Sequence, residues 1–140
     1  MRILALAIGS LAVVATGMAQ EVKVKVENEA VVFDAMPKKV NGITMVPVRT
    51  MLEAMQGSMR WAPDTRTVSA WKNSRRFDFV LNSREAVVND KPMRMDEAPL
   101  ILKNRIYVPI KFIADAAGYI ISQEDGWLVL RPAIKSPTKP

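Results

Sequence analysis

The pattern of apolar and polar positions predicts a chain built mainly of short strands. Apolar and polar residues alternate over residues 22–26 and 67–71, and residues 77–81 and 127–130 are two more apolar segments of strand length. Such alternation is typical of strands that bury one face. Four dipeptides that tolerate positive φ predict turns: Asn41-Gly42, Asn89-Asp90, Lys103-Asn104 and Asp125-Gly126.

Two short helices are predicted to begin at Pro47 and Pro109, because proline suits the first helical position, where no N–H is needed. After each proline, apolar residues fall at i, i+3, i+4 and i+7, which gives the helix one apolar face to pack on a sheet. Gly57 and Gly118 are the predicted helix ends. The two apolar faces consist of Val48, Met51, Leu52 and Met55, and of Ile110, Ile113, Ala114 and Ala117.

The segment around the first helix is repeated around the second, 62 positions later. Self-similarity of this kind predicts a duplicated unit, here about residues 31–62 and 93–124. The expected fold class is α+β, with a mostly antiparallel β-sheet wrapped on two short, repeat-related helices. Each helix should also carry an i, i+4 ion pair of about 0.2–0.5 kcal/mol. The paired positions are Asp34/Asp96, Pro37/Pro99, Val46/Val108, Pro47/Pro109, Arg49/Lys111, Glu53/Asp115 and Ala54/Ala116.

The two ends of the chain are predicted to lie outside the domain. Residues 1–19 have the basic start, the apolar run and the small residues Gly17 and Ala19 of a signal peptide cleaved near Ala19. The run is short for a membrane span, and a retained N-terminal anchor is the alternative. Residues 132–140 are rich in proline and lysine and are expected to form a disordered tail. Residues 20–131 are left as one domain.

The first repeat resembles the signature of the copper amine oxidase N-terminal-like domain, also called the stalk domain. The matching positions are Asn41, Gly42, Val46, Pro47, Arg49, Glu53, Ala54 and Trp61, followed in the second half by Val108, Pro109, Lys111, Asp115 and Gly118. The resemblance covers about residues 31–131 and implies a structural role for the motif residues. It also implies an accessory domain of exported bacterial proteins that carries neither copper nor quinone. The chain departs from the pattern at Gln56-Gly57, at Lys111 and Asp115, and at Gln123, which stands where the first half has Trp61.

The residue types present exclude several kinds of chemistry. The chain has no His and no Cys, so it lacks the three histidines of a copper oxidase, the Ser-His and Cys-His nucleophiles, and disulfides. No metal and no cofactor is therefore expected. The net charge of +6 comes from 20 basic and 14 acidic side chains spread along the chain, which allows weak attraction to anionic envelope polymers. No nucleic-acid-binding module is recognisable, so nucleic acid is not an expected partner.

Two groups of residues are candidates for catalysis or binding. Asp34 and Asp96 are repeat-equivalent carboxylates, as in a hydrolase with paired acids, but each precedes a proline by three residues, a setting more typical of a turn. The candidate ligand or partner surface consists of Trp71, Arg75 and Arg76, where strand 67–71 ends beside a polar run. The other tryptophans, Trp61 and Trp127, are expected in the core.

The predicted function is that of a non-catalytic, exported accessory or binding module of the bacterial cell envelope, secreted or periplasmic. The expected partner is an envelope polymer or another exported protein, with no membrane span in the mature chain. One alternative is a purely structural or self-associating spacer that forms a homo-oligomer, because an exposed strand edge offers a pairing site. A hydrolase that uses Asp34 and Asp96 ranks last.

Overall fold

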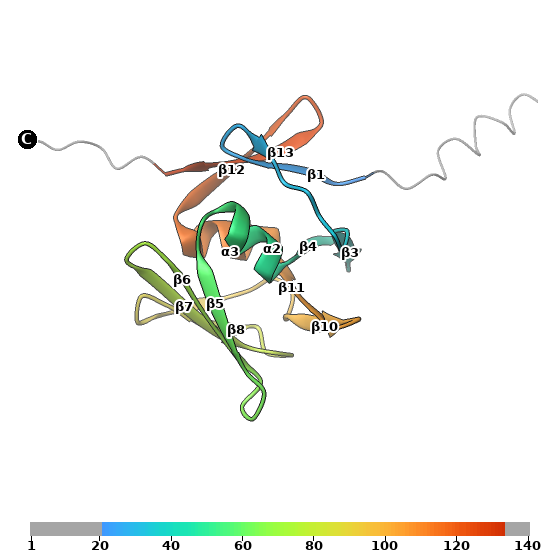
Figure 1. The fold of residues 1–140 in the computed structure, drawn as a ribbon. Coiled ribbons are helices and arrows are strands. Elements are labelled where there is room, and N and C mark those ends of the chain that lie inside the picture. The colour runs from blue at the N-terminus through green and yellow to red at the C-terminus, as the bar shows by residue number, and fades with distance from the viewer. Residues whose placement is uncertain (1–20, 134–140) are drawn as a thin grey trace, which may run out of the picture.

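Strand pairing dominates the architecture, as the alternating pattern predicts. The computed structural model describes residues 21–133. Within this range, thirteen strands form three sheets, and there are two short helices (Figure 1). All strand pairs but one are antiparallel. The structure therefore confirms an α+β fold that is mostly antiparallel. The predicted signal peptide and most of the predicted tail lie outside the described residues.

The central sheet is built on the pairing of β4 (Ile43–Pro47) with β11 (Arg105–Pro109). Val46 pairs with Val108, so the two positions that the sequence aligns with each other lie directly opposite. Both side chains are fully buried. The outer strands β3 (Lys38–Val40) and β10 (Leu100–Leu102) are added by hairpins to either side. The β4–β11 pair thus joins the two halves of the chain at equivalent points.

The turn prediction is confirmed at all four dipeptides. In each of them both residues have positive φ, from 49° at Lys103 to 84° at Gly126. Two successive residues with positive φ give the turn whose twist matches that of the flanking strands. The motif residues Asn41 and Gly42 therefore form the hairpin turn between β3 and β4, and the Asn41 side-chain amide also lies 3.3 Å from the Glu97 carboxylate.

The helices α2 (Val48–Ala54) and α3 (Ile110–Ala117) begin one residue later than predicted. Pro47 and Pro109 have extended ψ angles of 127° and 134°, so each is the last residue of its strand and the cap of its helix. The apolar faces of both helices are buried as predicted, and α3 buries Phe112 and Ala116 in addition. The Phe112 ring makes edge-to-face contacts with Phe77 and Phe79, with centroid distances of 6.0 and 5.7 Å.

The two helices end differently. Gly118 adopts the left-handed conformation at the end of α3, with φ of 86°, as predicted. The prediction for Gly57 is wrong, because Gln56 takes the left-handed conformation with φ of 64° after α2. Gly57 is needed for space instead: a Cβ atom there would lie 2.6 Å from the Trp71 carbonyl oxygen. The departure at Gln56-Gly57 therefore changes the helix end without changing the helix.

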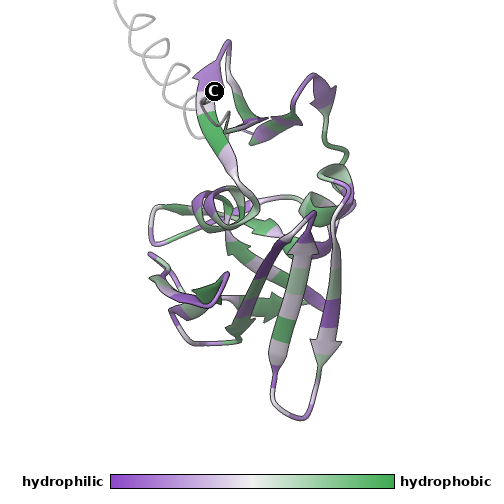
Figure 2. Ribbon diagram, turned by 90° about the vertical axis from the view of Figure 1, so that its left-hand side faces the viewer, coloured by the Kyte–Doolittle hydropathy of each residue, from purple (hydrophilic) through white to green (hydrophobic). Residues whose placement is uncertain are grey.

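The other two sheets contain the remaining strands. The larger has the order β5 (Ser58–Ala62), β6 (Thr67–Lys72), β7 (Arg75–Val80), β8 (Glu85–Val88) and β9 (Lys91–Arg94). Apolar and polar residues alternate along its strands, so that one face joins the core (Figure 2). The smaller sheet has the order β12 (Tyr119–Glu124), β13 (Trp127–Pro132), β1 (Lys23–Val26) and β2 (Glu29–Ala30). Its β1–β13 pair is the one parallel pair among the described strands.

Two single substitutions at the end of α2 should change the stability of the protein in opposite directions. Gly57→Ala forces a methyl group against a backbone carbonyl and should lower the free energy of unfolding by about 1–3 kcal/mol. Gln56→Gly relieves a left-handed non-glycine residue and should raise it by about 0.5–1 kcal/mol. Urea unfolding followed by circular dichroism measures both changes. Equal effects of the two variants would contradict this account of the helix end.

A second prediction concerns the β12–β13 hairpin. Hydrogen bonds from Arg131 and Ser122 lower the pKa of Glu124 from 4.5 to about 2. Because the folded-state pKa is the lower one, the stabilisation is complete above about pH 4.5 and is lost as the pH falls toward 2. An NMR titration of the Glu124 carboxyl carbon should give a midpoint near 2, and Arg131→Ala should raise it. Arg94→Ala, which removes the ion pair with Glu85 elsewhere, should leave the Glu124 midpoint unchanged.

Candidate ligand-binding surface

Each helix borders a hollow, and the two hollows occupy equivalent places in the two halves. The first, which we name the α2 pocket, has a volume of about 370 Å³, and the second, the α3 pocket, about 260 Å³. Five aligned positions line both: Asp34/Asp96, Pro47/Pro109, Arg49/Lys111, Thr50/Phe112 and Glu53/Asp115. The α2 pocket is completed by Met59, Trp61, Ile101, Asn104, Arg105 and Ile106. In each half, the exposed face of the helix carries charged motif residues, and this face lies beside a pocket.

The polar groups of the α2 pocket come from three separated parts of the chain. Arg105, at the start of β11, donates to the Asp34 carboxylate at 2.7 Å. Arg49 and Glu53 lie on successive turns of α2, and the predicted ion pair between them is not formed within 4 Å. Among residues 21–133, Arg49 has no carboxylate within that distance. Of the four charged groups in the pocket, Arg105 and Asp34 therefore form an ion pair, and Arg49 and Glu53 are presented separately.

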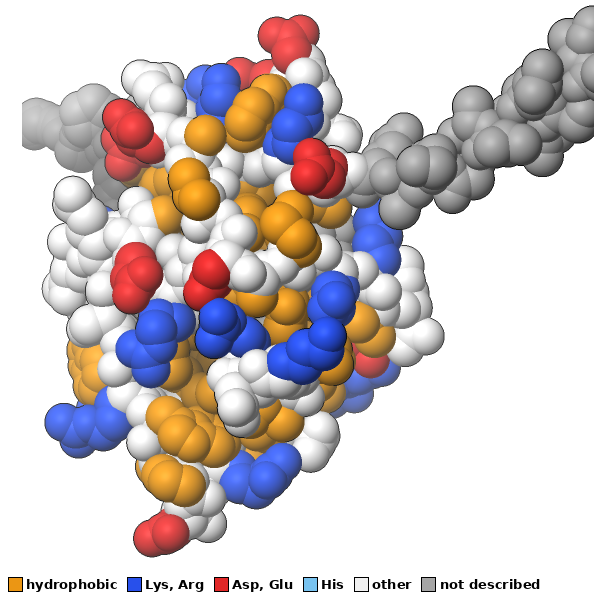
Figure 3. All heavy atoms as spheres, turned by 45° about the vertical axis from the view of Figure 1, so that its right-hand side comes forward, with side chains coloured by type: hydrophobic (Ala, Val, Ile, Leu, Met, Phe, Trp, Pro, Cys, Tyr) orange, Lys and Arg blue, Asp and Glu red, His pale blue; other side chains and the backbone are white. Residues whose placement is uncertain are grey.

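The apolar part of the α2 pocket is provided by strands on both sides. Trp61 on β5 is half-buried and packs against the core, and Met59 lies two residues before it on the same strand. Ile101 on β10 is 46% exposed, which is high for an isoleucine in a sheet. In the space-filling view from the side of β3 and β10, Lys and Arg side chains surround exposed hydrophobic atoms (Figure 3). The pocket therefore combines an aromatic surface with one ion pair and with two charged groups, Arg49 and Glu53, that are not paired with each other.

The α3 pocket has the same position but a different chemistry. Here the predicted ion pair is confirmed, with the Lys111 amine 3.1 Å from the Asp115 carboxylate. Phe112 is buried in the core at the position where the α2 pocket has Thr50. Gln123 is exposed at the position aligned with Trp61 and does not line the pocket. In the α3 pocket the two helix charges, Lys111 and Asp115, are therefore paired with each other, and no tryptophan lines the pocket.

The predicted surface of Trp71, Arg75 and Arg76 is divided by the structure. Arg75, half-buried on β7, donates from Nε to the Ala116 carbonyl oxygen at 2.8 Å. Its Cδ atom would lie 3.2 Å from a Cβ at Gly118, so the side chain fills the space that glycine leaves. Since α3 has no basic residue in its last turn, Arg75 supplies both a donor and a positive charge to that helix end. Arg75 therefore stabilises the fold.

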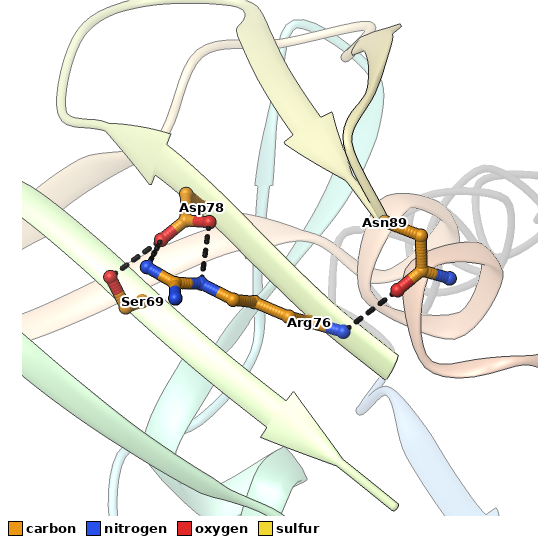
Figure 4. A network of polar contacts seen from close by, with 4 residues as sticks. All are labelled: Ser69, Arg76, Asp78 and Asn89. Atoms are coloured by element: carbon orange, nitrogen blue, oxygen red, sulfur yellow. Dashed lines mark hydrogen bonds and ion pairs between the residues drawn. The ribbon is translucent and has the colours of Figure 1, made fainter. Parts of the chain in front are cut away.

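Arg76 belongs to an exposed polar network on the same sheet (Figure 4). Its guanidinium bonds to Asp78 at 3.1 Å and 3.2 Å and lies 5.4 Å from the centroid of the half-buried Trp71 ring. Ser69 donates to Asp78 at 2.5 Å, and the Arg76 backbone N–H donates to Asn89 at 2.9 Å. The hydrogen bond with Asp78 raises the pKa of the Arg76 guanidinium above its ordinary value. The indole and the guanidinium of the predicted surface thus contact each other.

The remaining predicted residues are placed as follows. Asp34 and Asp96 line different pockets, so they do not form one pair of acids. Trp127 is half-buried, with the amines of Lys23 and Lys25 at 5.1 and 4.8 Å from its ring centroid. Among residues 21–133, none of the three tryptophans is fully buried. Trp61 packs against the core as expected but is partly exposed, whereas Trp127 is not among the residues that pack against it.

Arg105 is the charged pocket residue that sequence reasoning missed. It follows the Lys103-Asn104 turn, at the position where the first half has Ile43. A charged residue that replaces an apolar one between aligned repeats was the available signal. Its ion-pair partner Asp34 is 71 residues away, and only the pairing of β4 with β11 brings the two together.

The copper amine oxidase N-terminal domain matches residues 25–128. The chain belongs to this family. The match includes both pockets and both motif helices, and it supports a non-catalytic, stalk-like module. No curated protein matches the chain.

Within the described range, no group of three or more Asp or Glu side chains is placed to hold a metal ion. No helix in residues 21–133 has the length and apolar composition needed to cross a membrane.

The different roles of the two neighbouring arginines can be tested by stability measurements. Arg75→Ala removes a charged donor from a helix end and should lower the free energy of unfolding by about 1.5–3 kcal/mol. Arg76→Ala removes an exposed ion pair and should lower it much less than Arg75→Ala does. Thermal and urea unfolding of both variants provide the comparison. A larger loss for Arg76→Ala would contradict the assignment of Arg75 to the fold.

Proposed function

We propose that this protein is a non-catalytic binding module that is exported and attaches to a polymer or protein of the bacterial cell envelope. The observation that carries the proposal is the α2 pocket, in which the exposed Arg49 and Glu53, the Arg105–Asp34 ion pair and Trp61 surround one hollow. Membership of a non-catalytic domain family supports binding in preference to catalysis. Export rests on the signal-peptide pattern of residues 1–19, and the location is secreted or periplasmic.

We further propose that the domain arose by duplication. The alignment of residues 31–62 with 93–124, the facing pair of Val46 and Val108, and the two equivalent pockets support this origin. In this proposal the two helices are the repeat-related centre around which the strands are wrapped. After duplication, one pocket could change its residues while the other kept the fold.

A self-associating spacer is the second candidate, and one observation favours it. β12 is an edge strand of its sheet, and its Ile120 side chain is 60% exposed. An unpaired edge with an exposed apolar side chain is suited to pairing with a second copy. Sedimentation of the purified protein distinguishes the two candidates, since the spacer requires a dimer that Ile120→Lys abolishes.

Binding to the envelope can be measured directly. Purified protein of residues 20–140 should be retained on isolated native cell envelope, and retention should persist when the salt concentration is raised to about 0.5 M, where charge attraction is screened. A variant with Arg49→Ala and Trp61→Phe should be retained less. The matched control is Lys111→Ala, which changes the equivalent residue of the α3 pocket.

Retention that disappears with salt would reduce binding to charge attraction between a basic protein and an anionic surface. No retention at any salt concentration would contradict the proposed function.

A further inference from the structure

The two equivalent pockets differ in whether the two charged residues of the helix are paired, and the fold does not require this difference. In the α3 pocket, Lys111 is neutralised by Asp115, and α3 packs in the core with its charges paired. In the α2 pocket, the equivalent Arg49 and Glu53 are exposed and separate, although they too lie four residues apart on a helix. Folding the helix therefore does not need these two groups apart. Their separation leaves a donor and an acceptor available to a ligand.

The charges of the α2 pocket balance. It is lined by two guanidinium groups, from Arg49 and Arg105, and by two carboxylates, from Asp34 and Glu53, and Arg105 and Asp34 form an ion pair. The pocket therefore favours neither an anion nor a cation by its net charge. The uncharged Asn104 and Thr50 add groups that can both donate and accept. The partner that suits such a lining is uncharged and carries groups that donate and accept together, as hydroxyl groups do.

The pocket also offers an aromatic and aliphatic surface. Trp61 lines it together with Met59, Ile101 and Ile106. A sugar ring has an apolar face of C–H groups that can lie on an indole and a rim of hydroxyl groups that can reach the surrounding polar side chains. A volume of about 370 Å³ is at the small end of the range of ligand pockets, roughly 300–1,000 Å³. The pocket thus has room for a short saccharide segment.

A further hollow continues from the α2 pocket along the helix. It has a volume of about 300 Å³ and shares Thr50 and Glu53 with the α2 pocket. Its other lining residues include Glu29 and Val32, and the Val32 side chain is 86% exposed. Two hollows that adjoin along one helix fit a chain molecule better than a single small ligand.

From these observations we infer that the α2 pocket binds an uncharged oligosaccharide, with one sugar ring on Trp61 and its hydroxyl groups on Arg49, Glu53 and Asn104. The adjoining hollow takes the next part of the saccharide chain. The inference rests on the proposed function and specifies its ligand as a neutral glycan. The α3 pocket, in which Lys111 and Asp115 are paired with each other and which no indole lines, does not bind it.

The test uses two probes of defined composition, a hexamer of β-1,4-linked glucose and a hexamer of β-1,4-linked N-acetylglucosamine, with their monomers for comparison. Titration calorimetry of the residue 20–140 protein should show binding of at least one hexamer and weaker binding of its monomer. The affinity should change little between low salt and 0.5 M salt, because the ligand is uncharged. NMR shifts should cluster around Trp61 and α2.

Matched variants locate the site. Arg49→Ala, an exposed substitution, should weaken hexamer binding by roughly tenfold, and Lys111→Ala should leave it unchanged. Trp61→Phe keeps an aromatic ring and should fold even if Trp61→Ala does not, and its affinity should fall between those of the wild type and Arg49→Ala. Circular dichroism confirms that each variant is folded.

The results that overturn the inference are specific. The inference is overturned if neither hexamer binds with a dissociation constant of millimolar or below, or if Arg49→Ala and Lys111→Ala lose the same amount of hexamer affinity. It is also overturned if a charged peptide binds at the same pocket and neither hexamer competes with it. If the hexamers fail but native envelope still retains the protein through Arg49 and Trp61, the proposed function stands and the saccharide assignment fails. If the envelope also fails to retain it, both fail.

Discussion

The pairing of β4 with β11 is the contact on which the rest of the structure depends. Val46 and Val108 are opposite each other and fully buried, and each strand passes directly into a helix through a proline with extended ψ. Because proline fixes φ and no loop intervenes, the position of the strand pair determines where both helices lie. A register shift of one residue would move Val46 and Val108 to the opposite face of the sheet, away from the side chains that now pack around them, so the register is strongly specified.

Local features of this fold could be predicted from the sequence, and distant pairings could not. The turn at Asn41-Gly42 and the buried face of α2 follow from neighbouring residues, because they depend on φ preference and helical spacing. The division of the strands into three sheets depends on contacts such as Lys23 with Trp127, which are far apart along the chain. The left-handed Gln56 was missed because the close approach of Trp71 reserves the glycine for the next position.

The same limit applies to the binding surface. Asp34, Arg49, Glu53 and Trp61 were all recognisable as motif or candidate residues, but their arrangement around one pocket depends on β10 and β11. Conversely, Arg75 looked like a surface residue because it follows a strand beside other charges, while the helix end that it binds is 41 residues away. Residue type shows what a side chain can do, and tertiary contacts determine whether it is available.

The parallel pairing of β1 with β13 has a mechanical consequence. Because the two strands run in the same direction, the chain enters this sheet at one end, near Lys23, and leaves it at the other, near Pro132. Tension between these points acts along the strands, so the hydrogen bonds of the ladder are loaded in shear and must break together. An antiparallel pair pulled open from one end would separate one bond at a time. Tension between the two ends of the described chain would therefore be resisted by the whole β1–β13 ladder at once.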